Sequence, residues 1–320
     1  MPTKRVLVTG GNGYVGRRLT RLLAEANTVC VADVLRYGDW RFTAEERQRL
    51  RLEEIDIRNA PQVKALMDSF APDVVVHLAA IHYIPECEQD PMFATDTNVL
   101  GTLSLLLGCP QGCRFVFASS GAVYKPEPQP HREDSSEVGP SDVYGRSKLQ
   151  GEQLVQDFAA RRDLDAIVVR LFNVIGPGET NPHLLPELVA QLKAGRDMVE
   201  LGNLSPKRDY ISVQDAARGF AAAATGGVAR RGETRTVNLG TSRAYSVNEI
   251  IAKLRAISGV DFAVRQDESR IRAVDRPFLA ADVCRMAEVF NWRPADTIDD
   301  TLQDMWREPD LSAALQARYQ

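Results

Sequence analysis

Residues 6–16, VLVTGGNGYVG, decide how this chain begins to fold. A short run of apolar β-formers leads into a turn with four glycines: Gly10, Gly11, Gly13 and Gly16. The residues that follow, GRRLTRLLAEA (16–26), carry the apolar spacing of a helix. A glycine turn between a strand and a helix lets a pyrophosphate reach the amides at the helix N-terminus, because a Cβ would block that approach. The stretch therefore predicts a dinucleotide-binding unit.

A second apolar strand, TVCVAD (28–33), ends in Asp33. A carboxylate at this position accepts hydrogen bonds from both ribose hydroxyls of the adenosine and repels a 2′-phosphate, which favours NAD over NADP. Arg36 is close enough in sequence to weaken that discrimination. Asp56 follows a third apolar run near 50–57 and is a candidate for the adenine edge, or else a solvated residue.

Apolar β-rich runs alternate with longer amphipathic stretches through the first half of the chain. The predicted strands lie at 5–10, 28–33, 50–57, 73–80, 114–120 and 165–174. The predicted helices lie at 16–26, 60–70, 95–109 and 144–161. Continuous apolar strands separated by helices are typical of a parallel sheet that is covered on both faces. We therefore predict an α/β fold with a Rossmann-type doubly wound parallel sheet.

The composition changes after Asn173, where IGPGETNPHLLPE is rich in Gly and Pro. Shorter helices are predicted at 185–194 and 214–224, with short strands at 236–240 and 262–265. This pattern predicts a smaller, less regular C-terminal lobe that caps the carboxyl edge of the sheet, where ligands bind in such folds. The expected division is an NAD-binding domain (1–172) and a smaller substrate lobe (173–320), with some later segments returning to the first domain.

The composition excludes several classes of protein. The 320 residues are 44% hydrophobic and 26% charged, and the net charge of −4 arises from well-mixed acidic and basic residues. This gives no electrostatic case for binding nucleic acid or an anionic membrane. No apolar run approaches the roughly 20 residues that cross a bilayer, and the apolar run in MPTKRVLVTGG is too short for a signal peptide. We expect a cytoplasmic protein.

The cysteine count argues against a disulfide framework, because the five cysteines are odd in number and scattered. Cys109 and Cys113 are close in sequence, but no second pair and no His cluster accompanies them. We therefore predict reduced thiols and no metal.

The segment DVYGRSK (142–148) places Tyr144 and Lys148 four residues apart at the start of a helix, on one face. Two hydroxyls, Ser119 and Ser120, stand where the preceding strand ends. A phenol with a pKa of about 10 is a poor base at neutral pH. We expect the nearby ammonium and a cationic nicotinamide to lower that pKa. Tyr144 would then accept a proton from a substrate alcohol while a serine hydroxyl holds the same oxygen.

These motifs together resemble the extended short-chain dehydrogenases/reductases, and more narrowly the nucleotide-sugar epimerase/dehydratase family. The resemblance covers nearly the whole chain and rests on TGGNGYVG (9–16), Asp33, HLAA (77–80), SSGAVY (119–124), YGRSK (144–148), LFNVIGPG (171–178) and KRDYISVQD (207–215).

The resemblance implies roles for individual residues. Tyr144 matches the catalytic base, Lys148 the residue that holds the nicotinamide ribose, and Ser120 the hydroxyl on the reacting oxygen, with Ser119 as the alternative. The implied NAD contacts are Gly10, Gly13, Tyr14, Val15, Gly16, Asp33, Asp56, Ile57, Leu78, Ala79, Ala80, Tyr144 and Lys148. The implied contacts to a nucleotide-diphosphate sugar are Ser119, Ser120, His82, Asn173, Arg208, Arg272 and Arg276. In this set Arg208 matches a diphosphate ligand, and Arg272 or Arg276 would be the second.

The two residues after Ser120 distinguish between reactions. The family's 4,6-dehydratases carry an acid pair there, whereas this chain has Gly121 and Ala122, which disfavours dehydration because elimination needs an acid and a base. A 4-epimerase and a 4-keto-sugar reductase remain, and the preference of Asp33 for NAD favours the epimerase. A non-catalytic dinucleotide sensor is the alternative of a different class, but such proteins tend to lose the tyrosine or lysine that this chain keeps.

Three further features stay open at this level. Lys125 replaces the family's common glycine and is either a substrate contact or an exposed loop lysine. The loop IHYIPECEQDP (81–91) brings His82, Tyr83 and Glu86 within reach of a sugar, or else these are surface residues. In relatives, helices that match 95–109 and 144–161 form a four-helix seam, so we expect a homodimer.

Overall fold

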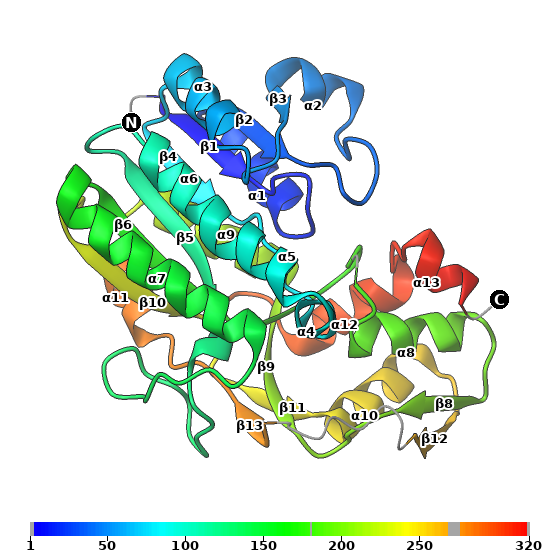
Figure 1. The fold of residues 1–320 in the computed structure, drawn as a ribbon. Coiled ribbons are helices and arrows are strands. Elements are labelled where there is room, and N and C mark those ends of the chain that lie inside the picture. Colours follow the sequence, from blue (N-terminus) through cyan, green and yellow to red (C-terminus); the bar gives the residue numbers. More distant parts are fainter. Residues whose placement is uncertain (1–2, 180, 268–275, 319–320) are drawn as a thin grey trace.

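A seven-stranded parallel sheet is the centre of the molecule (Figure 1). The structure is a computed structural model that describes residues 3–179, 181–267 and 276–318. The strand order is β10-β6-β5-β4-β1-β2-β3, and every neighbouring pair is parallel. The strands are β1 (Arg5–Thr9), β2 (Thr28–Asp33), β3 (Arg51–Glu54), β4 (Val74–His77), β5 (Arg114–Ser120), β6 (Asp165–Leu171) and β10 (Thr234–Leu239). This arrangement confirms the predicted doubly wound sheet.

Helices cover both faces of this sheet. One face packs against α1 (Gly16–Ala24), α9 (Val213–Thr225) and α11 (Cys284–Phe290). The other face packs against α3 (Ala60–Phe70), α6 (Gly101–Gly108) and α7 (Val143–Arg162). Successive residues of β1 enter the two cores in turn, because side chains along a strand alternate between faces. Both faces are therefore buried, which explains why the strands are apolar without alternation.

The expected helix at 95–109 is interrupted in the structure. Two α-helices, α5 (Pro91–Thr95) and α6, flank a π-helical turn, η1 (Asp96–Leu100). The buried Asn98 lies in this turn, where its amide bonds Ile81 N and O and the Ser147 hydroxyl. A π-turn adds a residue to the helix and redirects such a side chain. Asn98 thereby ties the loop after β4 to α7.

A smaller lobe follows β6 and has its own apolar core (lower right in Figure 1). Its helices are α8 (Leu184–Lys193), α10 (Val247–Ser258), α12 (Ile298–Arg307) and α13 (Ala313–Ala317). Its strands are β7 (Asn173–Ile175), β8 (Met198–Leu201), β9 (Lys207–Ser212), β11 (Ala244–Ser246), β12 (Ala263–Gln266) and β13 (Phe278–Leu279). The short helices α2 (Ala44–Arg49) and α4 (Ile84–Gln89) and the 3-10 turn η2 (Gly121–Val123) complete the elements.

Segments from the second half of the chain also contribute to the large sheet. Strand β10 is its edge strand, and α9 and α11 pack on its face. The boundary at 172/173 stays a prediction. None of the helices in the described ranges is long and apolar enough to span a bilayer.

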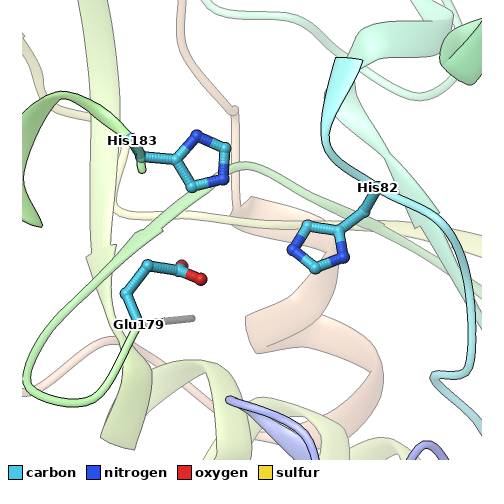
Figure 2. A group of neighbouring side chains, drawn as sticks. All are labelled: His82, Glu179 and His183. Carbon is cyan, nitrogen blue, oxygen red and sulfur yellow. The ribbon is translucent and has the colours of Figure 1, made fainter. Parts of the chain in front are cut away.

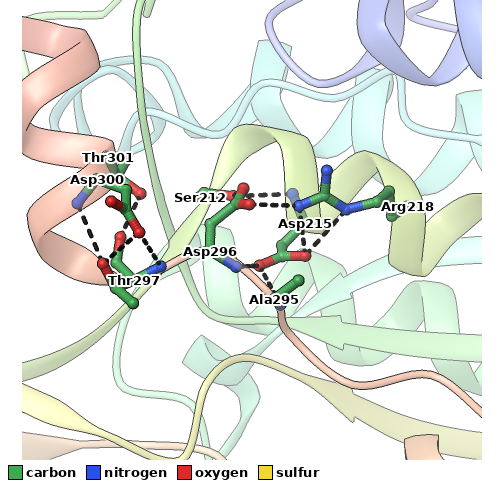
Figure 3. Close-up of polar contacts among 8 residues, drawn as sticks. All are labelled: Ser212, Asp215, Arg218, Ala295, Asp296, Thr297, Asp300 and Thr301. Atoms are coloured by element: carbon green, nitrogen blue, oxygen red, sulfur yellow. Dashed lines mark hydrogen bonds and ion pairs between the residues drawn. The ribbon is translucent and has the colours of Figure 1, made fainter.

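A buried carboxylate joins the two parts of the molecule (Figure 3). Asp215, in the first turn of α9, accepts hydrogen bonds from the side chain of Arg218 and from the backbone N–H groups of Ala295 and Asp296. Asp296 in turn accepts from the Ser212 hydroxyl and from Arg218. Helix α12 begins directly after this contact, with Thr297 as its N-cap. The network therefore holds the start of α12 against the helix that packs on the sheet.

Replacing Asp215 with Asn is expected to lower the free energy of unfolding by about 3 kcal/mol, because the amide places N–H groups where the carboxylate accepts bonds in a fully buried position. Urea denaturation followed by circular dichroism measures the change. Asp299→Asn removes an exposed ion pair with Lys253 and should cost about 1 kcal/mol or less. Equal losses in the two variants would contradict the role given to Asp215.

Candidate active site

A cavity of about 1580 Å³ lies along the carboxyl edge of the large sheet and extends into the smaller lobe. Ligands of open α/β sheets bind at this edge. Apart from Arg272, which lies outside the described residues, every residue named above as a catalytic, NAD or substrate contact lines this cavity. Residues that are distant in sequence are thus brought to one place, and their individual roles stay predictions.

The glycine turn is shaped by contacts within the chain. A Cβ on Gly16 would lie 2.1 Å from the Gly10 carbonyl oxygen and 2.7 Å from the Cα of Gly11. Gly10 has a φ of +70°, and a Cβ there would lie 2.7 Å from the backbone N of Ala79. Side chains at either position would force the turn open. The backbone is therefore folded tightly at the start of α1, which leaves a cradle that fits a pyrophosphate.

Asp33 is held at the end of β2 by two backbone N–H groups. Those of Asn12 and Leu35 each donate to its carboxylate at 3.0 Å. Burial raises the pKa of Asp33, and these hydrogen bonds act in the opposite direction. Arg36, which could have competed for this carboxylate, instead pairs with Glu86 and lies over the ring of Phe93. A fixed acceptor at the cavity wall is the feature that a ribose diol requires.

Other cofactor-side residues have identified partners. Asp56 forms an ion pair with Arg58. The Tyr14 hydroxyl donates to the Gly176 carbonyl at 3.0 Å, which ties the glycine turn to the loop after β7. The set of glycine turn, acid at the end of β2 and apolar wall at 78–80 fits a dinucleotide.

Helix α7 presents Tyr144 and Lys148 to the cavity. Its first turn is fixed by Asp142, whose side chain accepts from the Gly145 N–H at 2.7 Å. The Lys148 ammonium donates to the Ala118 carbonyl of β5 at 2.8 Å and lies 5.9 Å from the Tyr144 ring centre. Burial lowers the pKa of Lys148 to about 8. The two side chains therefore share one buried site.

The pKa of Tyr144 moves in the direction opposite to the expected one. Burial raises it, while a hydrogen bond from Ser120 acts to lower it. The Lys148 ammonium is bonded to the Ala118 carbonyl and does not outweigh this effect of burial. In the protein alone the cost of burying a phenolate therefore outweighs its stabilisation.

The structure distinguishes between the two serines. The Ser120 oxygen accepts from the Ala122 N–H at 3.1 Å, and Ser120 lies close enough to Tyr144 to act against the rise in the pKa of its phenol. The Ser119 hydroxyl instead donates to Glu152, which forms a buried ion pair with Arg170 at 2.7 Å. Ser119 is therefore committed to a structural network, and Ser120 is the hydroxyl beside the phenol.

The two residues that follow Ser120 on the cavity wall, Gly121 and Ala122, have no ionisable side chain. A Cβ on Gly121 would meet the ring of Phe172 at 3.1 Å. Arg276 is buried against this turn and donates to the carbonyls of Gly121 and Ala122. Arg208 donates to the Arg276 carbonyl at 2.6 Å, so both arginines lie on this side of the cavity.

Two residues left open by the sequence lie away from the cavity. Lys125 is exposed, pairs with Glu137 and is not part of the cavity lining, which agrees with an exposed loop lysine. Glu86 faces Arg36 and is not part of the lining either.

A group that sequence analysis did not anticipate lies on the cavity wall (Figure 2). His82, Glu179 and His183 turn toward one another, and their ligand atoms all lie within 4.8 Å of one another. Burial lowers the pKa of His82. The two histidines come from loops far apart in the chain, so no local spacing signals the group. The structural role of Asn98 was also not predicted, because the sequence around an Asn within an expected helix does not indicate its contacts with distant residues.

Comparisons with known proteins agree with this geometry. Residues 6–240 match the model of the NAD dependent epimerase/dehydratase family. UDP-glucose 4-epimerase 4 of Oryza sativa subsp. japonica is 30% identical, over 95% of this chain and 89% of its own. GDP-6-deoxy-D-mannose reductase of Pseudomonas aeruginosa is 28% identical, over 94% of this chain and 95% of its own. A similar solved structure is the crystal structure of UDP-glucose-4-epimerase from Stenotrophomonas maltophila with bound NAD and formylated UDP-arabinopyranose. It superimposes with a TM-score of 0.82 at 28% identity, and the match covers 96% of this chain and 98% of that one.

Replacing Gly16 with Ala is expected to weaken NAD binding more than about tenfold, equivalent to about 1.4 kcal/mol, because the new methyl group would displace the backbone of the turn. Calorimetric titration of NAD into cofactor-free protein measures the affinity. Gly195→Ala is the control: its φ is +79°, and nothing lies within 4 Å of its Cβ position. NAD binding by Gly16→Ala that matches this control would refute the assignment of the cradle.

Proposed function

The chain belongs to the NAD dependent epimerase/dehydratase family, and from this we propose that it interconverts nucleotide sugars that differ in configuration at C4. NAD is the cofactor. One observation carries the proposal: Tyr144, Lys148 and Ser120 line one part of the cavity, and the two residues that follow Ser120, Gly121 and Ala122, cannot transfer a proton. This set suits oxidation and reduction at one alcohol carbon and offers nothing for elimination.

When bound, NAD supplies a reversible hydride acceptor for that carbon. The residues of the chain handle the proton and the position of the oxygen. Tyr144 accepts the proton of the C4 hydroxyl and returns it after the sugar has presented its other face. Ser120 holds the same oxygen by a hydrogen bond, and the buried ammonium of Lys148 favours the anionic form of the phenol.

Dehydration is disfavoured by the residues at the two positions after Ser120. Loss of water from a 4-keto sugar needs a base for one proton and an acid for the departing hydroxyl. Gly121 and Ala122 supply neither, and the ring of Phe172 fills the space next to Gly121.

A 4-keto-sugar reductase is the second candidate, supported by the similarity to GDP-6-deoxy-D-mannose reductase. The same three residues serve both reactions, so the cofactor separates them. An epimerase keeps one NAD through each turnover, whereas a reductase consumes a reduced cofactor in proportion to product. The fixed carboxylate of Asp33 favours NAD and so supports the epimerase.

The substrate class follows from the cavity and the relatives. Arg208 and Arg276 supply guanidinium groups at the side of the cavity away from the glycine turn, and such groups bind diphosphate oxygens. Structures similar to this chain hold UDP-sugars, and proteins similar in sequence include UDP-glucose 4-epimerases. UDP is therefore the proposed nucleotide, and carbohydrate biosynthesis the proposed setting.

Five free cysteines agree with a reducing compartment such as the cytoplasm.

A homodimer is proposed from an apolar surface on α6 and α7. Leu100 and Leu107 are about half exposed, although one face of a helix normally buries such residues. Leu103 stands between them at helical spacing, and Leu154 and Phe158 of the neighbouring α7 are only partly buried. Figure 1 shows α6 and α7 side by side on one face of the sheet. A second copy of the same surface would cover this stripe.

Replacing Tyr144 with Phe is expected to lower turnover by about 10²–10⁴-fold while NAD stays bound, because only the proton acceptor is removed. Turnover is measured as the appearance of the C4 epimer of UDP-glucose or a related UDP-sugar, with no net change in NADH. Tyr124→Phe removes a hydroxyl that bonds Asn238 outside the cavity, so it should keep its turnover. A Tyr144→Phe protein that turns over at the wild-type rate would exclude the mechanism, and stoichiometric use of NAD(P)H with a keto sugar would identify a reductase.

Replacing Leu107 with Glu is expected to convert the dimer into a monomer, because two carboxylates would be buried at the proposed seam. Light scattering after size-exclusion chromatography should give twice the 35.4 kDa chain mass for the wild type and the single mass for the variant. Val228→Glu, at an exposed position outside these helices, should leave the mass unchanged. A monomeric wild type contradicts the proposal.

A further inference from the structure

Three potential metal ligands from two loops meet on the wall of the cavity. His82 lies in the loop between β4 and α4, whereas Glu179 and His183 lie in the loop between β7 and α8 (Figure 2). Their ligand atoms are mutually within 4.8 Å, and the two imidazole rings have centroids 6.3 Å apart. The described part of the chain contains no other cluster of three or more His, Cys, Asp or Glu side chains with this spacing.

Asn181 contacts all three of these residues. Its backbone N–H donates to a Glu179 carboxylate oxygen at 3.1 Å, and its carbonyl accepts from the His183 N–H at 2.8 Å. Its side-chain nitrogen lies 3.0 Å from Nε2 of His82. Asn181 is itself buried, and its contacts orient the three side chains. Residues outside the ligand set orient metal ligands in this way.

The hydrogen bond between His82 and Asn181 defines which nitrogen is available. A neutral imidazole carries a proton on one ring nitrogen only. In a neutral imidazole the other nitrogen then holds a lone pair. Nε2 faces the amide of Asn181, whose N–H occupies the direction of that lone pair. Nε2 is therefore the nitrogen that would bind an ion, and the Asn181 amide would turn aside to expose its lone pair.

Two imidazoles and one carboxylate are a donor set of defined preference. Mg²⁺ and Ca²⁺ prefer oxygen ligands, so two imidazoles disfavour these ions. Imidazole nitrogen suits divalent transition metals instead. Three protein ligands with an open position are typical of zinc sites that bind water or a substrate oxygen. Tetrahedral zinc with bonds of about 2.0–2.1 Å places donor atoms roughly 3.4 Å apart, so the present separations require only small side-chain rotations.

We propose that His82, Glu179 and His183 bind one divalent transition-metal ion, with zinc as the favoured ion, on the wall of the substrate cavity. Glu179 is buried, and a cation offsets the cost of burying its charge. All three residues line the same cavity as Tyr144 and Asn173, so an open coordination position there is available to an oxygen of a bound ligand.

The test uses the full chain without an affinity tag, because tag histidines bind zinc. The protein is treated with a chelator, desalted and titrated with ZnCl₂ in a calorimeter. We expect one Zn²⁺ per chain, and an affinity lower by about tenfold or more in Glu179→Gln and in His183→Asn. Substitution with Co²⁺ should give the d–d spectrum of nitrogen and oxygen ligands, without a thiolate charge-transfer band.

Two controls keep the result specific. Glu45→Gln makes the same charge change at an exposed position in α2 and should bind zinc as the wild type does. Cys109→Ser tests whether Cys109 and Cys113, which are close to each other in sequence, hold the ion instead. Thermal melting by circular dichroism verifies that each variant is folded before titration.

Absence of zinc binding by the wild type would overturn the proposal. So would equal affinity in the wild type and both ligand variants, or a thiolate band with Co²⁺. The readout does not depend on epimerase turnover, so failure of the metal site and failure of the proposed function are separate results.

Discussion

The hydrogen bond from the buried Lys148 ammonium to the Ala118 carbonyl is the contact on which the site depends. It joins α7 to β5 at the carboxyl edge of the sheet, and Tyr144, one turn earlier on α7, is thereby placed beside Ser120, two residues further along the strand. An ammonium held in this position is costly, which is why burial lowers the pKa of Lys148. The parallel sheet makes the contact possible, since its strand ends and the helix start meet at one edge.

Polar groups, rather than apolar surface alone, hold the smaller lobe in position against this edge. The buried Asp209 of β9 accepts hydrogen bonds from the backbone N–H groups of Thr241, Ser242 and Ala281. Asp215 does the same for the turn before α12 (Figure 3). Carboxylates that receive several backbone N–H groups specify the course of those loops, because an alternative path would leave the charge unpaired. The cavity between the lobes is therefore shaped by a few directional contacts.

The sequence predicts the sheet well and the details of the site less well, for physical reasons. Buried parallel strands are apolar throughout, so β5 was predicted at its observed bounds. The helix α3 was also predicted at its observed bounds. Neighbouring residues on a strand point to opposite faces, but the sequence does not say which face a hydroxyl takes. The family resemblance favoured Ser120 and left Ser119 as the alternative, and the structure shows that the two hydroxyls have different partners. The interruption at Asn98 depends on partners in a distant loop. The meeting of His82 with Glu179 and His183 likewise depends on two loops whose approach no local pattern records.

The direction of the Tyr144 pKa has a consequence for how the site works. Burial raises that pKa in the protein alone, and the hydrogen bond from Ser120 offsets only part of the effect. For the proposed role of Tyr144 as a base, part of the stabilising charge must therefore come from what fills the cavity, since the nearest fixed ammonium is bonded to a backbone carbonyl. A base that ionises only in the filled site stays protonated in the empty one. Proton removal is then coupled to ligand occupancy by the same burial that makes the phenol a poor base on its own.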